Sequence, residues 1–165
     1  MARRPVIGVM GAGEGASPRD VRFAETLGEL IAAEGWVLLT GGRDAGVMKA
    51  ASRGAKRITG SIVVGVLPSD EGDVAPDVDV AIFTGLGNAR NAVNILTSQV
   101  VIACGVGGPG TASEAALALK AGRPLILLAP SEEAKAFFVT IGVVHVAESP
   151  ADAIEIIRTR RLLDD

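Results

Sequence analysis

The sequence predicts an α/β protein with a doubly wound, Rossmann-like and mostly parallel sheet that carries helices on both faces. Strand-like and helix-like segments alternate along the chain, as in a parallel sheet built from βαβ units. The central strand segments are continuously apolar, so helices must cover both of their faces. A length of 165 residues suits one domain with a real core and is short for two. We therefore expect a single domain over residues 1–165.

Seven short apolar segments are the expected strands. Most are bounded by glycine, proline or acidic residues, which end strands. The fifth segment is rich in β-branched residues and is expected to be fully buried. The segments are residues 5–10, 36–40, 61–67, 78–83, 99–103, 124–129 and 143–146.

Local signals mark the helices between these strands. Residues 17–20 (Ser-Pro-Arg-Asp) and 149–152 (Ser-Pro-Ala-Asp) each place a serine at the N-cap, a proline at the first helical position and an acid three residues after the cap. Ser131 is expected to cap a short helix that ends near Phe138. Further helices are expected after the glycine turns at 41–46, 85–88 and 107–111.

Four glycine-rich turns follow expected strands, at residues 11–15, 41–46, 85–88 and 107–111. In a parallel doubly wound sheet the carboxyl ends of the strands meet at one edge, where ligands bind. The turn at 107–111 leads into a helix whose free N–H groups and dipole suit a phosphate or another oxyanion. The alternative is a tight strand-to-helix connection without a ligand. We expect a small phosphate-bearing ligand at this edge.

Composition argues against several classes of partner. A net charge of −3 and 3% aromatic residues do not favour nucleic-acid binding. The uncharged span 91–113 is interrupted by glycines and a proline, so we expect no membrane segment, and the basic start at residues 1–4 does not resemble a signal peptide. The single Cys104 excludes an internal disulfide and suits the cytoplasm. The single His145 is expected to be structural, and no metal site is predicted.

Two common nucleotide motifs are absent. The Gly11-x-Gly13-x-Gly15 pattern lacks the G-x-G-x-x-G spacing, and no carboxylate follows the second strand, which ends in residues 39–42 (Leu-Thr-Gly-Gly). Both features argue against a nicotinamide dehydrogenase. The G-x-x-x-x-G-K-[ST] loop of ATP-hydrolysing proteins is also missing.

Three stretches resemble the LOG family, long mislabelled as lysine decarboxylases. Residues 107–114 (Gly-Gly-Pro-Gly-Thr-Ala-Ser-Glu) are similar to its PGGxGTxxE signature. Residues 41–48 resemble its GGG-x-x-G-L-M turn, and residues 89–91 (Ala-Arg-Asn) take the place of its Arg-Lys pair. These stretches occur in the family's order and span most of the chain. Residues 85–91 and the Gly-Gly-x-Gly-Thr-x-Ser-Glu form resemble the branch that contains the molybdenum-cofactor carrier proteins.

The resemblance implies a Rossmann-like homo-oligomer, a dimer or a tetramer. The family's enzymes hydrolyse the N-glycosidic bond of nucleoside 5′-monophosphates, releasing the base and ribose 5-phosphate. The carrier branch binds the molybdenum cofactor, an anionic pterin that bears a phosphate, as cargo. Val106 replaces the leading proline of the signature and Asn91 replaces the lysine of the Arg-Lys pair, and both departures weaken the enzymatic hypothesis more than the binding hypothesis.

The sequence therefore supports two hypotheses for the function. The first is a binding protein for a phosphate-bearing, nucleotide-like ligand, with the molybdenum cofactor as candidate cargo. The alternative is a nucleoside 5′-monophosphate phosphoribohydrolase. Nothing in the sequence resembles the pyridoxal-phosphate site of a lysine decarboxylase.

Arg90 and Glu114 are the candidate catalytic residues, and no charged residue lies between them in the sequence. Arg90 would grip a phosphate or orient a ribose with its planar guanidinium; the alternative is a solvated arginine. By the resemblance, Glu114 is the carboxylate that assists glycosidic cleavage. The alternative is a capping box with Thr111, in which Glu114 bonds only backbone.

The expected ligand-binding residues share a position in or next to the glycine turns. Arg43 and Asp44 either reach the same edge or belong to a solvated turn. The acidic loop at 70–73 is expected to be solvated, with a lid or a metal contact as the alternative. Cys104 is expected to be a small buried residue without an activated thiolate. The ligand-binding set is Gly11, Gly13, Gly41, Gly42, Gly46, Met48, Asn88, Arg90, Gly107, Gly108, Gly110 and Thr111.

Overall fold

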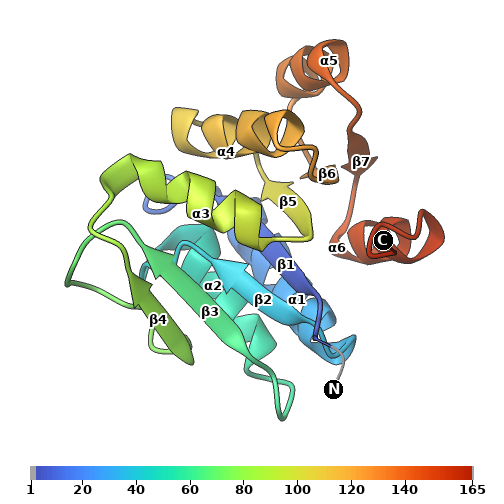
Figure 1. Ribbon diagram of the computed structural model, residues 1–165. Coiled ribbons are helices and arrows are strands. Elements are labelled where there is room, and N and C mark those ends of the chain that lie inside the picture. The colour runs from blue at the N-terminus through green and yellow to red at the C-terminus, as the bar shows by residue number, and fades with distance from the viewer. Residues whose placement is uncertain (1–2, 165) are drawn as a thin grey trace.

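The computed structural model describes residues 3–164, so Met1 and Ala2 of the basic start lie outside the described residues. These residues form one sheet of seven strands in the order β4-β3-β2-β1-β5-β6-β7 (Figure 1). Every strand pair in it is parallel. The predicted α/β, doubly wound fold is confirmed.

The strands and helices alternate as the sequence indicates. The strands are β1 (Val6–Gly11), β2 (Val37–Thr40), β3 (Val63–Leu67), β4 (Val80–Phe83), β5 (Val100–Cys104), β6 (Leu125–Leu128) and β7 (His145–Ala147). The helices are α1 (Pro18–Ala33), α2 (Gly46–Ala55), α3 (Arg90–Thr97), α4 (Pro109–Lys120), α5 (Glu132–Ile141) and α6 (Pro150–Thr159), with a short 3₁₀ turn η1 (Gly87–Ala89) before α3. Within residues 3–164, no helix is both long and apolar enough to cross a bilayer.

Two apolar cores lie between the sheet and its helices, one on each face of the sheet. On one face α1, α2 and α6 pack against the sheet, with Leu27 and Ile154 in a common cluster. On the other face Ile95 of α3, Ala115 of α4 and Phe138 of α5 form a second cluster. Figure 1 shows α3 and α4 on the side of the sheet opposite α1 and α2. Helices therefore cover both faces, as the apolar strands require.

The strand order reverses between β1 and β5. The chain proceeds outward from β1 to β4 and then returns to place β5 on the free side of β1. The last residues of these two strands, Gly11 and Cys104, are register partners. The turns that follow β1 and β5 consequently diverge from neighbouring points, which is where a doubly wound sheet opens a ligand crevice.

Helices α1 and α2 touch through their backbones. A Cβ atom at Gly28 would lie 2.0 Å from Ala51 O, and one at Gly54 would lie 1.8 Å from Glu25 O. Only glycine permits this approach. Glu25 also forms ion pairs with Arg53 and Arg57 across the same contact. The two helices thus form a close-packed layer behind β1–β3.

Capping signals located the helix starts well, and most differences from prediction concern element ends. The serine caps at residues 17, 131 and 149 are all present. Helix α5 continues beyond Phe138 to Ile141 because no helix breaker occurs before Gly142. The last strand begins later than expected: His145 pairs with Ile126, whereas Val143 is 85% exposed.

We predict that Gly28→Ala destabilises the fold by about 1–3 kcal/mol, the usual cost of overpacking a tight contact. The methyl group would force the backbones of α1 and α2 apart. Gly15→Ala is the matched control, because a Cβ atom there has no described atom within 4 Å. Urea denaturation of both variants measures the difference, and equal midpoints would contradict the close-contact interpretation.

Candidate functional site

A cavity of about 320 Å³ lies at the carboxyl edge of the sheet, beside the point where the strand order reverses. It is enclosed by the turns that follow β1 and β2 and by the first residues of α3 and α4. All four predicted turns contribute to it. The predicted residues that line it are Gly11, Gly13, Gly41, Met48, Asn88, Arg90, Gly108, Gly110, Thr111 and Glu114.

Three predicted ligand-binding residues do not line this cavity. Gly42 faces Gly65 of β3, and Gly46 lies against the carbonyl oxygen of Gly13. Both have positive φ angles, 75° and 49°, so they shape the turn after β2. Gly107 precedes the N-cap of α4 and also lies outside the cavity wall.

The first turn of α4 presents unpaired backbone donors. Gly108 is the N-cap, has an extended backbone and makes no side-chain cap, and Pro109 follows at the first helical position. The first intrahelical hydrogen bond runs from Ala112 N to Gly108 O. The N–H groups of Gly110 and Thr111 precede it and are available at the positive end of the helix dipole. This is an anion-binding arrangement.

The capping-box hypothesis for Glu114 is wrong. Pro109 starts the helix earlier than the Thr-x-x-Glu spacing suggests, so Thr111 lies inside the first turn and Gly108 is the cap. Glu114 Oε1 instead accepts a hydrogen bond from Asn94 Nδ2 at 3.2 Å, and Glu114 is 7% exposed. Burial raises the pKa of the Glu114 carboxyl, while the bond from Asn94 and the charge of Arg90 act against this rise.

Arg90 is not a solvated arginine. It begins α3, and its Nη1 donates to Gly41 O at 2.9 Å and to Val66 O at 2.5 Å. A Cβ atom at Gly41 would lie 2.5 Å from this nitrogen, so a glycine there lets the guanidinium reach the sheet edge. Burial lowers the pKa of Arg90, and the negative charge of Glu114 opposes that effect. The arginine is thus a fixed cation at the floor of the cavity.

Arg43 supplies a second cation to the cavity wall. It also lines an adjoining hollow of about 250 Å³ together with Glu14, Asp44 and Asp73. Asp44 pairs with Lys49 at 3.0 Å. Sequence analysis left the placement of Arg43 open, and the structure puts it at the same edge as Arg90.

Asn94 is a site residue that sequence analysis missed. It lies four residues after Arg90 on α3, and residues at this spacing share one face of a helix. An amide on the same face as a predicted ligand-binding arginine was the available signal. Asn91, noted only as a departure from the family pattern, lines the cavity and donates to Ser113 Oγ at 3.2 Å.

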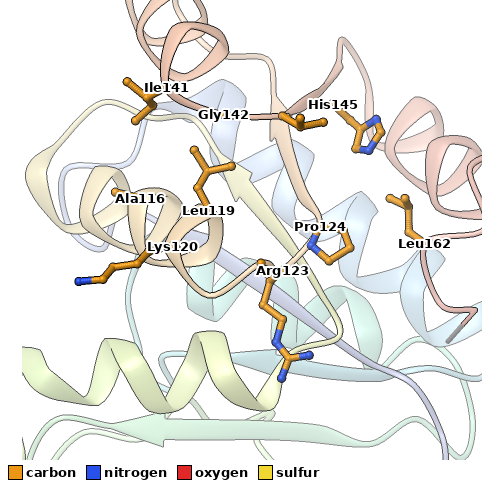
Figure 2. A pocket seen from close by; sticks show the side chains of 11 residues that line it. Ala116, Leu119, Lys120, Arg123, Pro124, Ile141, Gly142, His145 and Leu162 are labelled. Atoms are coloured by element: carbon orange, nitrogen blue, oxygen red, sulfur yellow. The ribbon is translucent and has the colours of Figure 1, made fainter.

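A larger hollow, of about 620 Å³, lies at the opposite edge of the sheet. Figure 2 shows Leu119 and Ile141 facing it, whereas the Lys120 amine and the Arg123 guanidinium point away. Arg123 Nη2 donates to Leu96 O at 2.7 Å. Burial and the nearby Arg160 lower the pKa of His145, which also lines the hollow. The Lys120 and Arg123 side chains that border this hollow are therefore directed away from its interior.

Metal-ligating groups are scattered across the part of the chain that the structure describes. Within residues 3–164, no three His, Cys, Asp or Glu side chains lie together in a way that would hold a metal ion. Cys104 is buried, and its burial raises the thiol pKa to about 12. Its Sγ lies 3.5 Å from Asp20 O.

The profile of the SLOG cluster4 family matches residues 4–154. The chain belongs to this family. Membership in SLOG cluster4, together with the structural neighbours below, confirms the resemblance to LOG-like proteins and to the molybdenum-cofactor carrier branch.

Several relatives of this SLOG cluster4 protein align over nearly its full length. The molybdenum cofactor binding protein from Rippkaea orientalis is 51% identical, with a TM-score of 0.93 over 98% of this chain and 99% of that one. The molybdenum cofactor carrier protein from Chlamydomonas reinhardtii is 47% identical, with a TM-score of 0.88 over 97% and 99%. An uncharacterised protein of Archaeoglobus fulgidus is 42% identical over 149 residues, 90% of this chain and 91% of its own.

We predict that Cys104 does not react with an aromatic disulfide reagent at pH 8 while the protein is folded. A thiol with a pKa of about 12 has little thiolate at that pH, and burial blocks the reagent. One equivalent should react after unfolding in guanidinium chloride. Rapid release of the coloured thiol from the native protein would contradict this expectation.

Proposed function

We propose that this SLOG cluster4 protein binds a phosphate-bearing, nucleotide-like ligand and carries the molybdenum cofactor as cargo. The observation that carries the proposal is the open N-terminus of α4 facing a cavity that also holds Arg43 and Arg90. The identity of 51% and 47% to a molybdenum cofactor binding protein and a carrier protein, over nearly the whole chain, supports this choice of ligand.

Each part of the cavity has a task in this proposal. The N–H groups of Gly110 and Thr111 and the Thr111 hydroxyl bind the phosphate of the cofactor. Arg90 and Arg43 balance its charge. The glycine walls leave room for a flat ring to approach the backbone. A volume of about 320 Å³ lies at the lower end of the range for small-ligand sites.

Hydrolysis of nucleoside monophosphates is the less favoured function. Of the described residues that line the cavity, Glu114 alone is a carboxylate, and its burial raises its pKa. An oxocarbenium-like transition state is stabilised by an ionised carboxylate, which this environment disfavours. Val106 and Asn91 add to the same conclusion, as the sequence indicated.

We also infer that the protein works in the cytoplasm as a homo-oligomer. Edge strand β4 exposes three large apolar side chains, those of Val80, Ile82 and Phe83, by 42–48%. Native proteins usually protect an apolar edge strand with charged side chains, or cover it with another element or another chain. Sedimentation equilibrium should give the mass of two or four chains, and the mass of one chain at micromolar concentration would contradict this inference.

Phosphate binding at α4 predicts a charge-specific loss of affinity. Gly110→Asp should weaken molybdopterin binding at least about tenfold, because a carboxylate would stand where the phosphate binds; one decade corresponds to 1.4 kcal/mol. The fold should be unaffected, since an acid in the first turn of a helix is favourable and a Cβ atom at Gly110 has no described atom within 4 Å. Gly110→Asn is the matched control of equal size and should retain most of the affinity.

The measurement is gel filtration of the protein with molybdopterin, followed by pterin fluorescence of the protein fraction. Equal retention by the Asp and Asn variants would contradict a phosphate contact at this turn. In parallel, the wild-type protein should release no free base from AMP. Base release that disappears in Glu114→Ala would establish the hydrolase instead.

A further inference from the structure

Asn94 and Glu114 form a buried polar pair beneath the first turn of α4. Asn94 is 0% exposed and Glu114 is 7% exposed. Asn94 Nδ2 donates to Glu114 Oε1 at 3.2 Å. Glu114 lines the cavity, whereas Asn94 lies behind it and outside the cavity wall. Asn94 therefore acts on a ligand only through Glu114.

One atom of this pair lacks a partner. Asn94 Oδ1 is buried and receives no hydrogen bond from any residue between 3 and 164. Leaving a buried carbonyl oxygen unpaired is costly, and native structures rarely do so. An ionised carboxylate only accepts hydrogen bonds, whereas a neutral carboxyl group also has one O–H donor. A neutral Glu114 can thus give Asn94 Oδ1 the donor that it lacks.

We propose that Asn94 is a positioning residue that holds Glu114 in a cyclic carboxyl–amide pair, and that phosphate binding at α4 favours the neutral form of Glu114. In this pair Asn94 Nδ2 donates to one carboxyl oxygen, and the O–H on the other oxygen donates to Asn94 Oδ1. The proton comes from solvent, and no covalent step is involved. The link to phosphate rests on the function proposed above.

The charges around Glu114 explain the coupling. Of the described residues that line the cavity, those with charged side chains are Arg43, Arg90 and Glu114. Arg43 lies in the loop after β2 and Arg90 on α3, while β1 and the first turn of α4 contribute uncharged residues. In the free site the Arg90 charge favours ionised Glu114. A bound phosphate offsets the two arginines and repels the carboxylate, so it raises the proton affinity of Glu114.

The coupling is reciprocal and has a definite sign. Since the ligand prefers neutral Glu114, raising the pH ionises this residue and weakens binding. One proton per ligand limits the effect to about tenfold in affinity per pH unit. Glu114→Gln keeps a neutral donor and acceptor at the same place, so its affinity should change with pH only as far as the phosphate itself titrates.

The decisive experiment is an NMR pH titration of the full chain, in which the glutamates are labelled with carbon-13 at Cδ. Glu114→Gln identifies the Glu114 signal by its loss. Without ligand, we expect the Glu114 midpoint to lie above those of the exposed glutamates, and saturating inorganic phosphate should move it higher. A ligand-free midpoint at or below the exposed ones would overturn the pair.

Asn94→Leu tests the positioning role. In the proposed pair neutral Glu114 makes two hydrogen bonds to Asn94, whereas ionised Glu114 makes one and faces the unpaired Oδ1. Removing the amide therefore costs the neutral form more, so the Glu114 midpoint should fall in this variant. Circular dichroism checks that the variant is folded. An unchanged midpoint in folded Asn94→Leu would show that Asn94 does not position Glu114, and the wild-type titration stands as a test even if the variant fails to fold.

Backbone amide signals separate this inference from the proposed function. Phosphate should shift the amide resonances of Gly110 and Thr111. If it does not, the phosphate site is wrong, while the ligand-free midpoint still decides the existence of the pair. If these amides shift and the Glu114 midpoint stays in place, the pair is not coupled to binding.

Discussion

The double hydrogen bond of Arg90 Nη1 determines the shape of the site. This nitrogen joins the start of α3 to the carbonyl of Gly41 after β2 and to the carbonyl of Val66 in β3. The cation is thereby fixed at the sheet edge, where it opposes the desolvation of Glu114 across the cavity. The arrangement depends on the missing side chain of Gly41. Arg90 therefore contributes both to the shape of the cavity and to its charge.

The two helical layers differ in how they are held together. On one face of the sheet, the backbones of α1 and α2 are in direct contact at Gly28 and Gly54. On the other face, α3 and α4 are joined near the cavity by two side-chain hydrogen bonds, from Asn91 to Ser113 and from Asn94 to Glu114. Close packing leaves no room for a ligand, whereas the polar contacts border an opening. The site consequently adjoins the starts of α3 and α4 at the carboxyl edge of the sheet.

The fold was predictable because its signals are local. Alternating segments, continuous apolar strands and the serine caps at residues 17, 131 and 149 each act within a few residues. The environment of Glu114 was not predictable in this way. Its partner Asn94 comes from another helix, and the Thr111 spacing favoured a local cap that Pro109 displaces. The strand-end turns were located correctly, but which glycines face the cavity depends on tertiary contacts such as Gly42 against Gly65.

Five of the residues that line the cavity are glycines, which expose their main chain to a ligand. Where binding groups are backbone amides, as at Gly110 and Thr111, exchange of one small side chain for another leaves the donor in place. Affinity at such a surface is lost by added bulk or added charge. Discrimination between ligands then depends on the polar side chains that line the same cavity, such as Arg43, Asn88 and Asn91. Proteins with this arrangement can acquire new ligands through changes in those side chains, while the backbone amides that bind the anion stay the same.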